Sequence, residues 1–159
     1  NHLNVERISS EKIISGEGLS RIAEWRLSKS DAKNHPFQKI IKELGISDKS
    51  RKKIPEQICK LSNDGDILMM EIEQIWLEAY ASLLGDIAVH ELCFGGLWIS
   101  GGTANKHLKN FKSDPFLKQL SNKGRLIDIV KSIPINVISD EEFGLYSAAC
   151  RAKMLLKTP

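Results

Sequence analysis

The stretch Gly95-Gly96-Leu97-Trp98-Ile99-Ser100-Gly101-Gly102-Thr103 decides the fold of this chain of 159 residues. Its centre, Leu97 to Ile99, is continuously apolar, which predicts a strand covered on both faces. Gly101-Gly102 ends the strand, and Thr103 is a good N-cap for a following helix. Such a turn lets the backbone approach a ligand, and helix N-termini favour phosphate. A tight turn with no ligand is the alternative, because short glycine motifs often match by chance.

A long helix is expected before this stretch and a second strand after it. Apolar residues recur at steps of three and four over residues 67–92, and the stripe is wide enough to predict burial on more than one side. Residues 135–138 are mostly β-branched and predict a strand. Helices separate the strands 97–100 and 135–138, which favours a right-handed crossover with parallel strands. Because two strands make a poor sheet, further strands would come from a neighbour or from another part of the protein.

Composition and charge are typical of a globular domain. The chain has 42% hydrophobic and 27% charged residues, and its 23 basic and 20 acidic side chains give a net charge of +3. That balance is too mild to indicate nucleic acid or an anionic membrane as a partner. No apolar run approaches the roughly 18 residues of a membrane span.

The three cysteines give no sign of a metal site. Cys59, Cys93 and Cys150 lack metal-ligand spacing and indicate free thiols in a reducing compartment. The first residue is Asn1, as expected for a chain that begins inside a longer protein or is processed.

A second glycine-rich segment lies near the start of the chain. Residues 10–14 predict a short helix or turn with Glu11 at its front, and Ser15-Gly16-Glu17-Gly18 follows. Gly16 and Gly18 permit backbone conformations that bring a ligand close. From its position, Glu11 is either a solvated or capping acid or a ligand. The sequence has no phosphate-binding GxxxxGK[ST] loop and no nucleophile elbow.

Four segments occur in the order of motifs from a known family. Residues 8–19 (ISSEKIISGEGL) are similar to V-S-x-E-R-V-x-S-G-x-G-L, and residues 94–102 (FGGLWISGG) to F-G-G-[VL]-[FY]-I-A-G-G. Residues 116–125 resemble an F-x-x-[AF]-F-x-x-K-G-R region, and residues 134–145 resemble a closing strand followed by G-L-x-G-[AS]. Each motif is weak alone, but four in the right order and spacing are specific. The chain therefore resembles the bacterial glucokinase family over nearly all of its length.

The resemblance implies an α/β, helix-rich fold that forms part of the carboxy-terminal lobe of an actin-like (hexokinase/Hsp70-type) ATPase fold. It implies a cytoplasmic enzyme that transfers a phosphoryl group from ATP, with Mg²⁺, to the 6-hydroxyl of glucose. Glu11 would be a sugar ligand, because a carboxylate accepts several hydroxyl donors with charge-assisted strength. The residues implied to bind nucleotide are Ser15, Gly16, Gly101, Gly102 and Thr103.

The sequence also departs from the family pattern. The D-x-G-G-T-N phosphate loop, the N-D pair whose Asp is the general base, and the E-G-G-H sugar segment are absent, and all three precede the matched region. Residues 1–159 are therefore expected to be a partial carboxy-terminal lobe, with the amino-terminal lobe outside this chain. No catalytic residue or metal ligand is assigned within it. Lys12 replaces an Arg of the family pattern, and Glu17 lies within the G-x-G loop, so the nucleotide side matches less well.

The function expected from the resemblance is glucose phosphorylation by a longer parent protein, with the isolated chain inactive. One alternative is another sugar kinase of the same fold, specific for an N-acetylhexosamine or using polyphosphate as its donor. A second is a degenerate kinase half that serves as a partner surface without catalysis. The 67–92 helix could also contribute a face to a homodimer.

Overall fold

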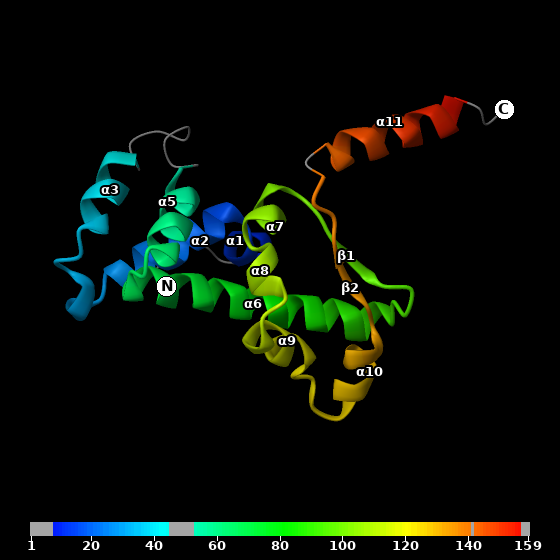
Figure 1. The fold of residues 1–159 in the computed structure, drawn as a ribbon, viewed down its shortest axis with the longest axis horizontal. Helices are drawn as coiled ribbons and strands as arrows, with labels where there is room; N and C mark the ends of the chain where they lie inside the picture. The colour runs from blue at the N-terminus through cyan, green and yellow to red at the C-terminus, as the bar shows by residue number, and fades with distance from the viewer. Residues whose placement is uncertain (1–7, 45–52, 141, 157–159) are drawn as a thin grey trace. The chain divides into compact units, whose positions relative to one another are not determined.

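The computed structural model describes residues 8–44, 53–140 and 142–156, and for residues 103 and 104 only the backbone (Figure 1). The chain divides into two compact units, residues 1–84 and 85–159. The first unit is helical. Its elements are α1 (Glu11–Ile14), α2 (Gly16–Leu27), the 3₁₀ turn η1 (Ser30–Ala32), α3 (Phe37–Leu44), α5 (Ile54–Asn63) and most of α6 (Ile67–Glu91).

The second unit is an α/β unit that begins within the last turns of α6. Its further elements are β1 (Leu97–Ile99), α7 (Gly102–Lys106), α8 (Leu108–Phe111), α9 (Asp114–Ser121), the 3₁₀ turn η2 (Gly124–Leu126), α10 (Ile127–Ser132), β2 (Ile135–Val137) and α11 (Phe143–Leu156). Together the two units make a helix-rich α/β chain, as the sequence predicts.

Helix α6 is the longest helix in the described part of the chain, and its position confirms the helix predicted over 67–92. It begins with a side-chain cap, because Asp66 Oδ1 accepts a hydrogen bond from the backbone N–H of Met69 at 3.0 Å. Met69, Ile72 and Trp76 are fully buried at the spacing of one helix face. The core of the first unit also contains apolar side chains from the other helices, among them Leu19, Ala23, Phe37, Ile54 and Ile58.

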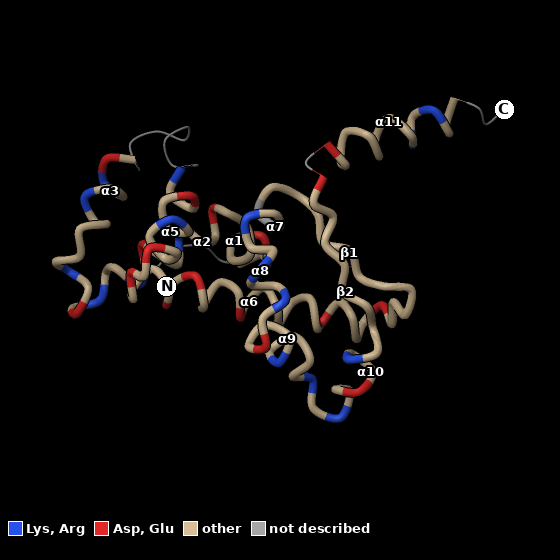
Figure 2. The backbone as a smooth tube through the Cα atoms, in the orientation of Figure 1, with Lys and Arg blue, Asp and Glu red and all other residues tan. Residues whose placement is uncertain are grey.

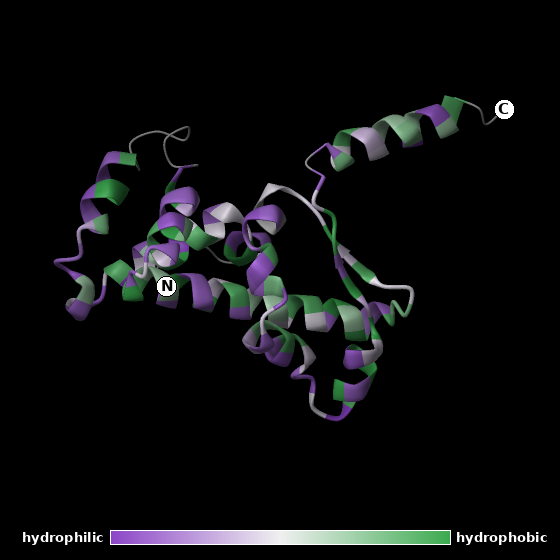
Figure 3. Ribbon diagram, in the orientation of Figure 1, coloured by the Kyte–Doolittle hydropathy of each residue, from purple (hydrophilic) through white to green (hydrophobic). Residues whose placement is uncertain are grey.

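The two strands pair in parallel, as predicted, with Leu97 opposite Ile135 and Ile99 opposite Val137. Each ends one residue before its predicted bound. The prediction that the first strand is covered on both faces is wrong for the described residues. Leu97 and Ile99 are buried, whereas Trp98 between them is 63% exposed, so only one face is covered. Figure 3 shows green apolar segments in both strands interrupted by paler or purple ones, as expected for a sheet with one covered and one open face.

The turn after β1 differs from the sequence prediction in one detail. Helix α7 begins at Gly102, so Thr103 lies in its first turn and is not its N-cap. The carbonyl of Gly101 accepts the first helical hydrogen bond, from the N–H of Asn105 at 3.4 Å. Gly101 has a φ of 107°, a conformation that glycine adopts readily and that lets the chain turn one residue earlier than predicted.

The described helices differ in the charge they carry. Helices α2, α3, α5 and α9 carry both basic and acidic side chains, whereas α6 lacks Lys and Arg and carries only acidic ones besides His90: Glu71, Glu73, Glu78, Asp86 and Glu91 (Figure 2). None of the helices in the described ranges is long and apolar enough to cross a membrane.

Candidate functional site

The corner between α1 and α2 presents the carboxylate of Glu11. Glu11 is the first residue of α1, and its side chain is exposed. Within the described ranges, no side chain forms a hydrogen bond or ion pair with that carboxylate. Both of its oxygens are therefore available to accept hydrogen bonds from the hydroxyls of a ligand.

Close packing fixes the corner below Glu11. The hydroxyl of Ser15 accepts a hydrogen bond from the N–H of Gly18 at 3.1 Å and so caps α2. A Cβ on Gly18 would lie 2.0 Å from the carbonyl oxygen of Ile13, so the two helices approach within a distance that only glycine allows. Arg21 ion-pairs with Glu17 and donates a hydrogen bond to the carbonyl of Lys12 at 3.4 Å.

The long helix α6 also contacts this corner. The indole N–H of Trp76 donates a hydrogen bond of 3.2 Å to the carbonyl of Ser15, and the side chain of Trp76 is completely buried. The N–H of Ser15 in turn donates to the carbonyl of Glu11 at 3.2 Å. Trp76 belongs to the apolar stripe over residues 67–92, which predicts its burial but not the partner of its indole N–H.

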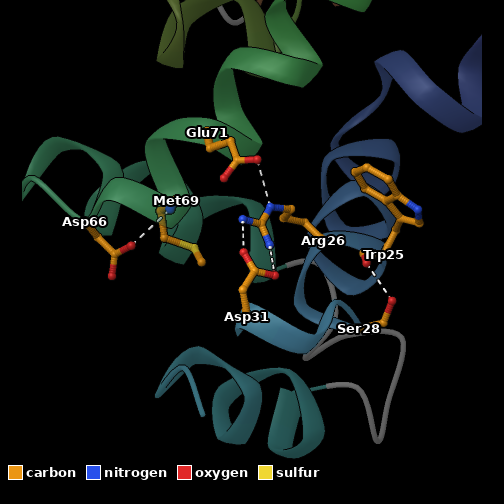
Figure 4. Close-up of polar contacts among 7 residues, drawn as sticks. All are labelled: Trp25, Arg26, Ser28, Asp31, Asp66, Met69 and Glu71. Carbon is orange, nitrogen blue, oxygen red and sulfur yellow. Dashed lines mark hydrogen bonds and ion pairs between the residues drawn. The ribbon is translucent and has the colours of Figure 1, made fainter. Parts of the chain in front are cut away.

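The carboxyl end of α2 is fixed as well (Figure 4). Arg26 extends from α2 between two carboxylates, with Nε 2.8 Å from Glu71 of α6 and Nη2 2.8 Å from Asp31 of η1. The hydrogen bond with Arg26 holds the pKa of the Asp31 carboxyl below its usual value. The same two carboxylates raise the pKa of Arg26. Helix α2 is thus anchored at both ends, which gives the Glu11 corner a rigid support.

The second glycine turn lies in the second unit and is open to solvent. Gly101 and Gly102 are both exposed, and no atom comes within 4 Å of a Cβ placed on either residue. The backbone at this turn therefore faces free space that a flat ligand group could enter. The turn follows the carboxyl end of β1, and in open α/β sheets ligands bind beyond the carboxyl ends of parallel strands.

Two hydrogen bonds join this turn to the end of β2. The N–H of Ile138 donates to the carbonyl of Ile99 at 2.8 Å, which keeps the two strand ends adjacent. The side-chain amide of Asn105, in α7, donates to the carbonyl of Ser139 at 3.0 Å. The segment after each strand is therefore held at one edge of the sheet, with the glycine pair exposed there.

The residues predicted to bind ligands fall into two groups. Glu11, Ser15 and Gly16 share the α1–α2 corner of the first unit, and Gly16 lies in ordinary contact range of Pro55. Residues 101–103 form the turn of the second unit. The hydroxyl and the carbonyl of Ser15 are both used within the corner. Neither Trp76 nor Arg21 stands out in the sequence as part of a site, because each contacts the corner only through the tertiary fold.

The fold is that of a helix-rich α/β protein, with an open acidic corner in its first unit and an open backbone turn in its second. The chain matches the Glucokinase family over residues 2–155. It belongs to the glucokinase family.

Individual relatives agree with that assignment. The chain is 29% identical over 157 residues to a protein of Nostoc sp. named glucokinase, and 30% identical over 157 residues to one of Nostoc punctiforme. In both cases the match covers 95% of this chain and 46% of the relative. A glucokinase of Helicobacter pylori is 29% identical over 145 residues, with 39% of its length covered. The chain thus spans less than half the length of these curated relatives.

Proposed function

We propose that this chain is part of an enzyme that phosphorylates glucose to glucose 6-phosphate with ATP. The observation that supports this most is the open carboxylate of Glu11 on a corner fixed by close packing, in a chain of the glucokinase family. A rigid acceptor with no competing partner in the described ranges suits a polyol, because it accepts hydroxyl donors without first giving up a bond of its own.

The nucleotide is proposed to bind at the second glycine turn. The space beside Gly101 and Gly102 would admit the adenosine part of ATP against the backbone, with Thr103 next in the turn. At the α1–α2 corner that presents Glu11, Ser15 and Gly16 are proposed to line the side that faces the nucleotide. Phosphoryl transfer of this kind depends on positioning and on neutralising charge, for which ATP is used with Mg²⁺. We assign no Mg²⁺ ligand to this chain.

The remaining groups are proposed to belong to a longer protein. In this proposal, residues 1–159 are part of the carboxy-terminal lobe of an actin-like ATPase fold, and the amino-terminal lobe supplies the phosphate loop and the aspartate that acts as general base. The complete enzyme is proposed to act in the cytoplasm. The 159-residue chain would then bind substrates weakly and catalyse nothing by itself.

Steady-state kinetics of the full-length protein tests this function. The assay compares glucose with mannose and N-acetylglucosamine as acceptors, and ATP with polyphosphate as donors. Glucose with ATP is expected to give the highest kcat/KM, and the 159-residue chain is expected to show no turnover. A preference for N-acetylglucosamine or polyphosphate would overturn the assignment in favour of another sugar kinase. No turnover with any pair would indicate a degenerate half that acts as an interaction module.

A further inference from the structure

We infer that Trp76 is a positioning residue for the carboxylate of Glu11. This inference rests on the proposed function, because it concerns how the sugar ligand is held. It starts from the length of α1, which has only four residues, Glu11 to Ile14. A single helical turn has no stability of its own in water, so its geometry depends on contacts with the rest of the unit.

Ser15 links α1 to α6. The N–H of Ser15 donates to the carbonyl of Glu11, and the carbonyl of Ser15 accepts from the indole of Trp76, each at 3.2 Å. The two bonds connect the main chain of Glu11 through one peptide to a side chain of α6. Within the described ranges no side chain pairs with the Glu11 carboxylate, so the position of that group depends on this main-chain support.

Trp76 is well suited to act as a fixed donor. Its side chain is fully buried in α6, a helix of 25 residues, and its ring is stacked at a tilt against Tyr80 with 5.2 Å between centroids. The indole has a single donor, its N–H, and at the corner this N–H donates to the carbonyl of Ser15. The carbonyl of Ser15 also accepts a hydrogen bond from the N–H of Leu19 within α2, at 3.0 Å. Without the indole N–H, that carbonyl would keep its bond within α2 but lose the bond that ties the corner to α6.

Gly18 supports the same corner through a close backbone contact. The carbonyl of Ile13 lies so near that a Cβ on Gly18 would be 2.0 Å away, well inside contact distance. Glycine at 18 therefore lets α1 approach α2, while Trp76 fixes the peptide that joins them. Loss of the Trp76 N–H or a Cβ on Gly18 would displace α1 and move Glu11 away from the geometry that binds sugar. Even a small displacement of a binding group weakens substrate binding.

The test uses the full-length enzyme with Trp76→Phe, which keeps a buried aromatic ring and removes the N–H. The KM for glucose is expected to rise about fivefold or more, while the KM for ATP changes less than about twofold. The matched control is Phe37→Leu, another large, fully buried side chain of the first unit. A purely structural loss lowers the amount of folded enzyme and leaves both KM values unchanged, and this is the result expected for the control.

Two further variants keep the inference falsifiable if Trp76→Phe folds poorly. Gly18→Ala is expected to raise the KM for glucose by displacing α1 without removing a hydrogen-bond donor. In a Glu11→Gln background, Trp76→Phe is expected to have little further effect on that KM, because Trp76 acts through Glu11.

The outcomes separate this inference from the proposed function. If Glu11→Gln leaves the KM for glucose unchanged, the proposed sugar ligand is wrong. If Glu11→Gln raises that KM but folded Trp76→Phe and Gly18→Ala enzymes keep the wild-type value, the positioning role is overturned and the proposed function stands. Full additivity of Trp76→Phe with Glu11→Gln would also overturn it.

Discussion

Arg26 holds Asp31 through two parallel hydrogen bonds, from Nη1 to Oδ1 at 3.1 Å and from Nη2 to Oδ2 at 2.8 Å. Its third donor, Nε, binds Glu71 at 2.8 Å. One guanidinium thus links α2, η1 and α6. The side chain of Arg26 is only 13% exposed, whereas Asp31 and Glu71 are 65% and 46% exposed, so solvent screens these ion pairs from the side of the carboxylates.

Replacing Arg26 with lysine is expected to destabilise the first unit. Lysine carries one compact charge and cannot reproduce the planar fork that binds two carboxylates. The midpoint of thermal unfolding, followed by circular dichroism, is expected to fall measurably for Arg26→Lys. The control is Arg151→Lys, at an exposed position of α11, which should leave the midpoint unchanged. Equal midpoints for the two variants would show that the Arg26 fork adds no stability.

The Asp31 link predicts a dependence of stability on pH. Arg26 lowers the pKa of Asp31 in the folded chain below its ordinary value of 3.8. The ionised carboxylate therefore stabilises the fold above that ordinary value, and this contribution is lost as pH falls through the lower pKa of the folded state. The difference in unfolding midpoint between wild type and Asp31→Asn is expected to be constant at about pH 5–7 and to narrow below about pH 4. A difference in unfolding midpoint that grows as the pH falls below about 4 would contradict the lowered pKa of Asp31.

Gly85 lies where the second unit has no room for a larger side chain. A Cβ at this position of α6 would lie 2.2 Å from the carbonyl oxygen of Leu120 in α9. Gly85→Ala is expected to lower the free energy of unfolding by about 1–3 kcal/mol through overpacking. Gly144→Ala, in the first turn of α11 where a Cβ meets no atom within 4 Å, should be neutral or slightly stabilising. Chemical denaturation of both variants measures this, and a neutral Gly85→Ala would disprove the close contact.

The open turn at Gly102 predicts an effect specific to nucleotide. Gly102→Val places a branched side chain in the free space where adenosine is proposed to lie. In the full-length enzyme, the KM for ATP is expected to rise about tenfold, with the KM for glucose changed less than about twofold. Gly95→Val is the control, because Gly95 also faces open space but precedes the strand. An unchanged KM for ATP would place the nucleotide elsewhere.

Hydrophobic periodicity predicted the main elements because it reports which face is buried. The stripe that contains Ile72 and Trp76 predicts α6 to within one residue, and the β-branched run at 135–138 predicts β2. Periodicity fails where a short element lacks neighbours. Trp98 is apolar and reads as buried, yet it is exposed because its face of the two-stranded sheet is uncovered in the described part of the chain.

The candidate site was predictable only in part. The resemblance to a family selects Glu11 and the glycine turn at 101–102, but it carries no information about the groups that hold them. The bond from Trp76 to Ser15 joins residues 61 positions apart, and the close approach at Gly18 depends on backbone geometry. Such contacts arise from tertiary packing, which a local pattern does not encode.

The most direct test of the account is the KM for glucose of full-length Glu11→Gln. This change keeps the size of the side chain and removes its charge, so hydroxyl donors lose a charge-assisted acceptor worth about 1.5–3 kcal/mol each. The KM is expected to rise at least tenfold. The matched control is Glu43→Gln, an exposed glutamate of α3, which should leave the KM unchanged. A wild-type KM for glucose in folded Glu11→Gln would contradict the central claim that this corner binds the sugar.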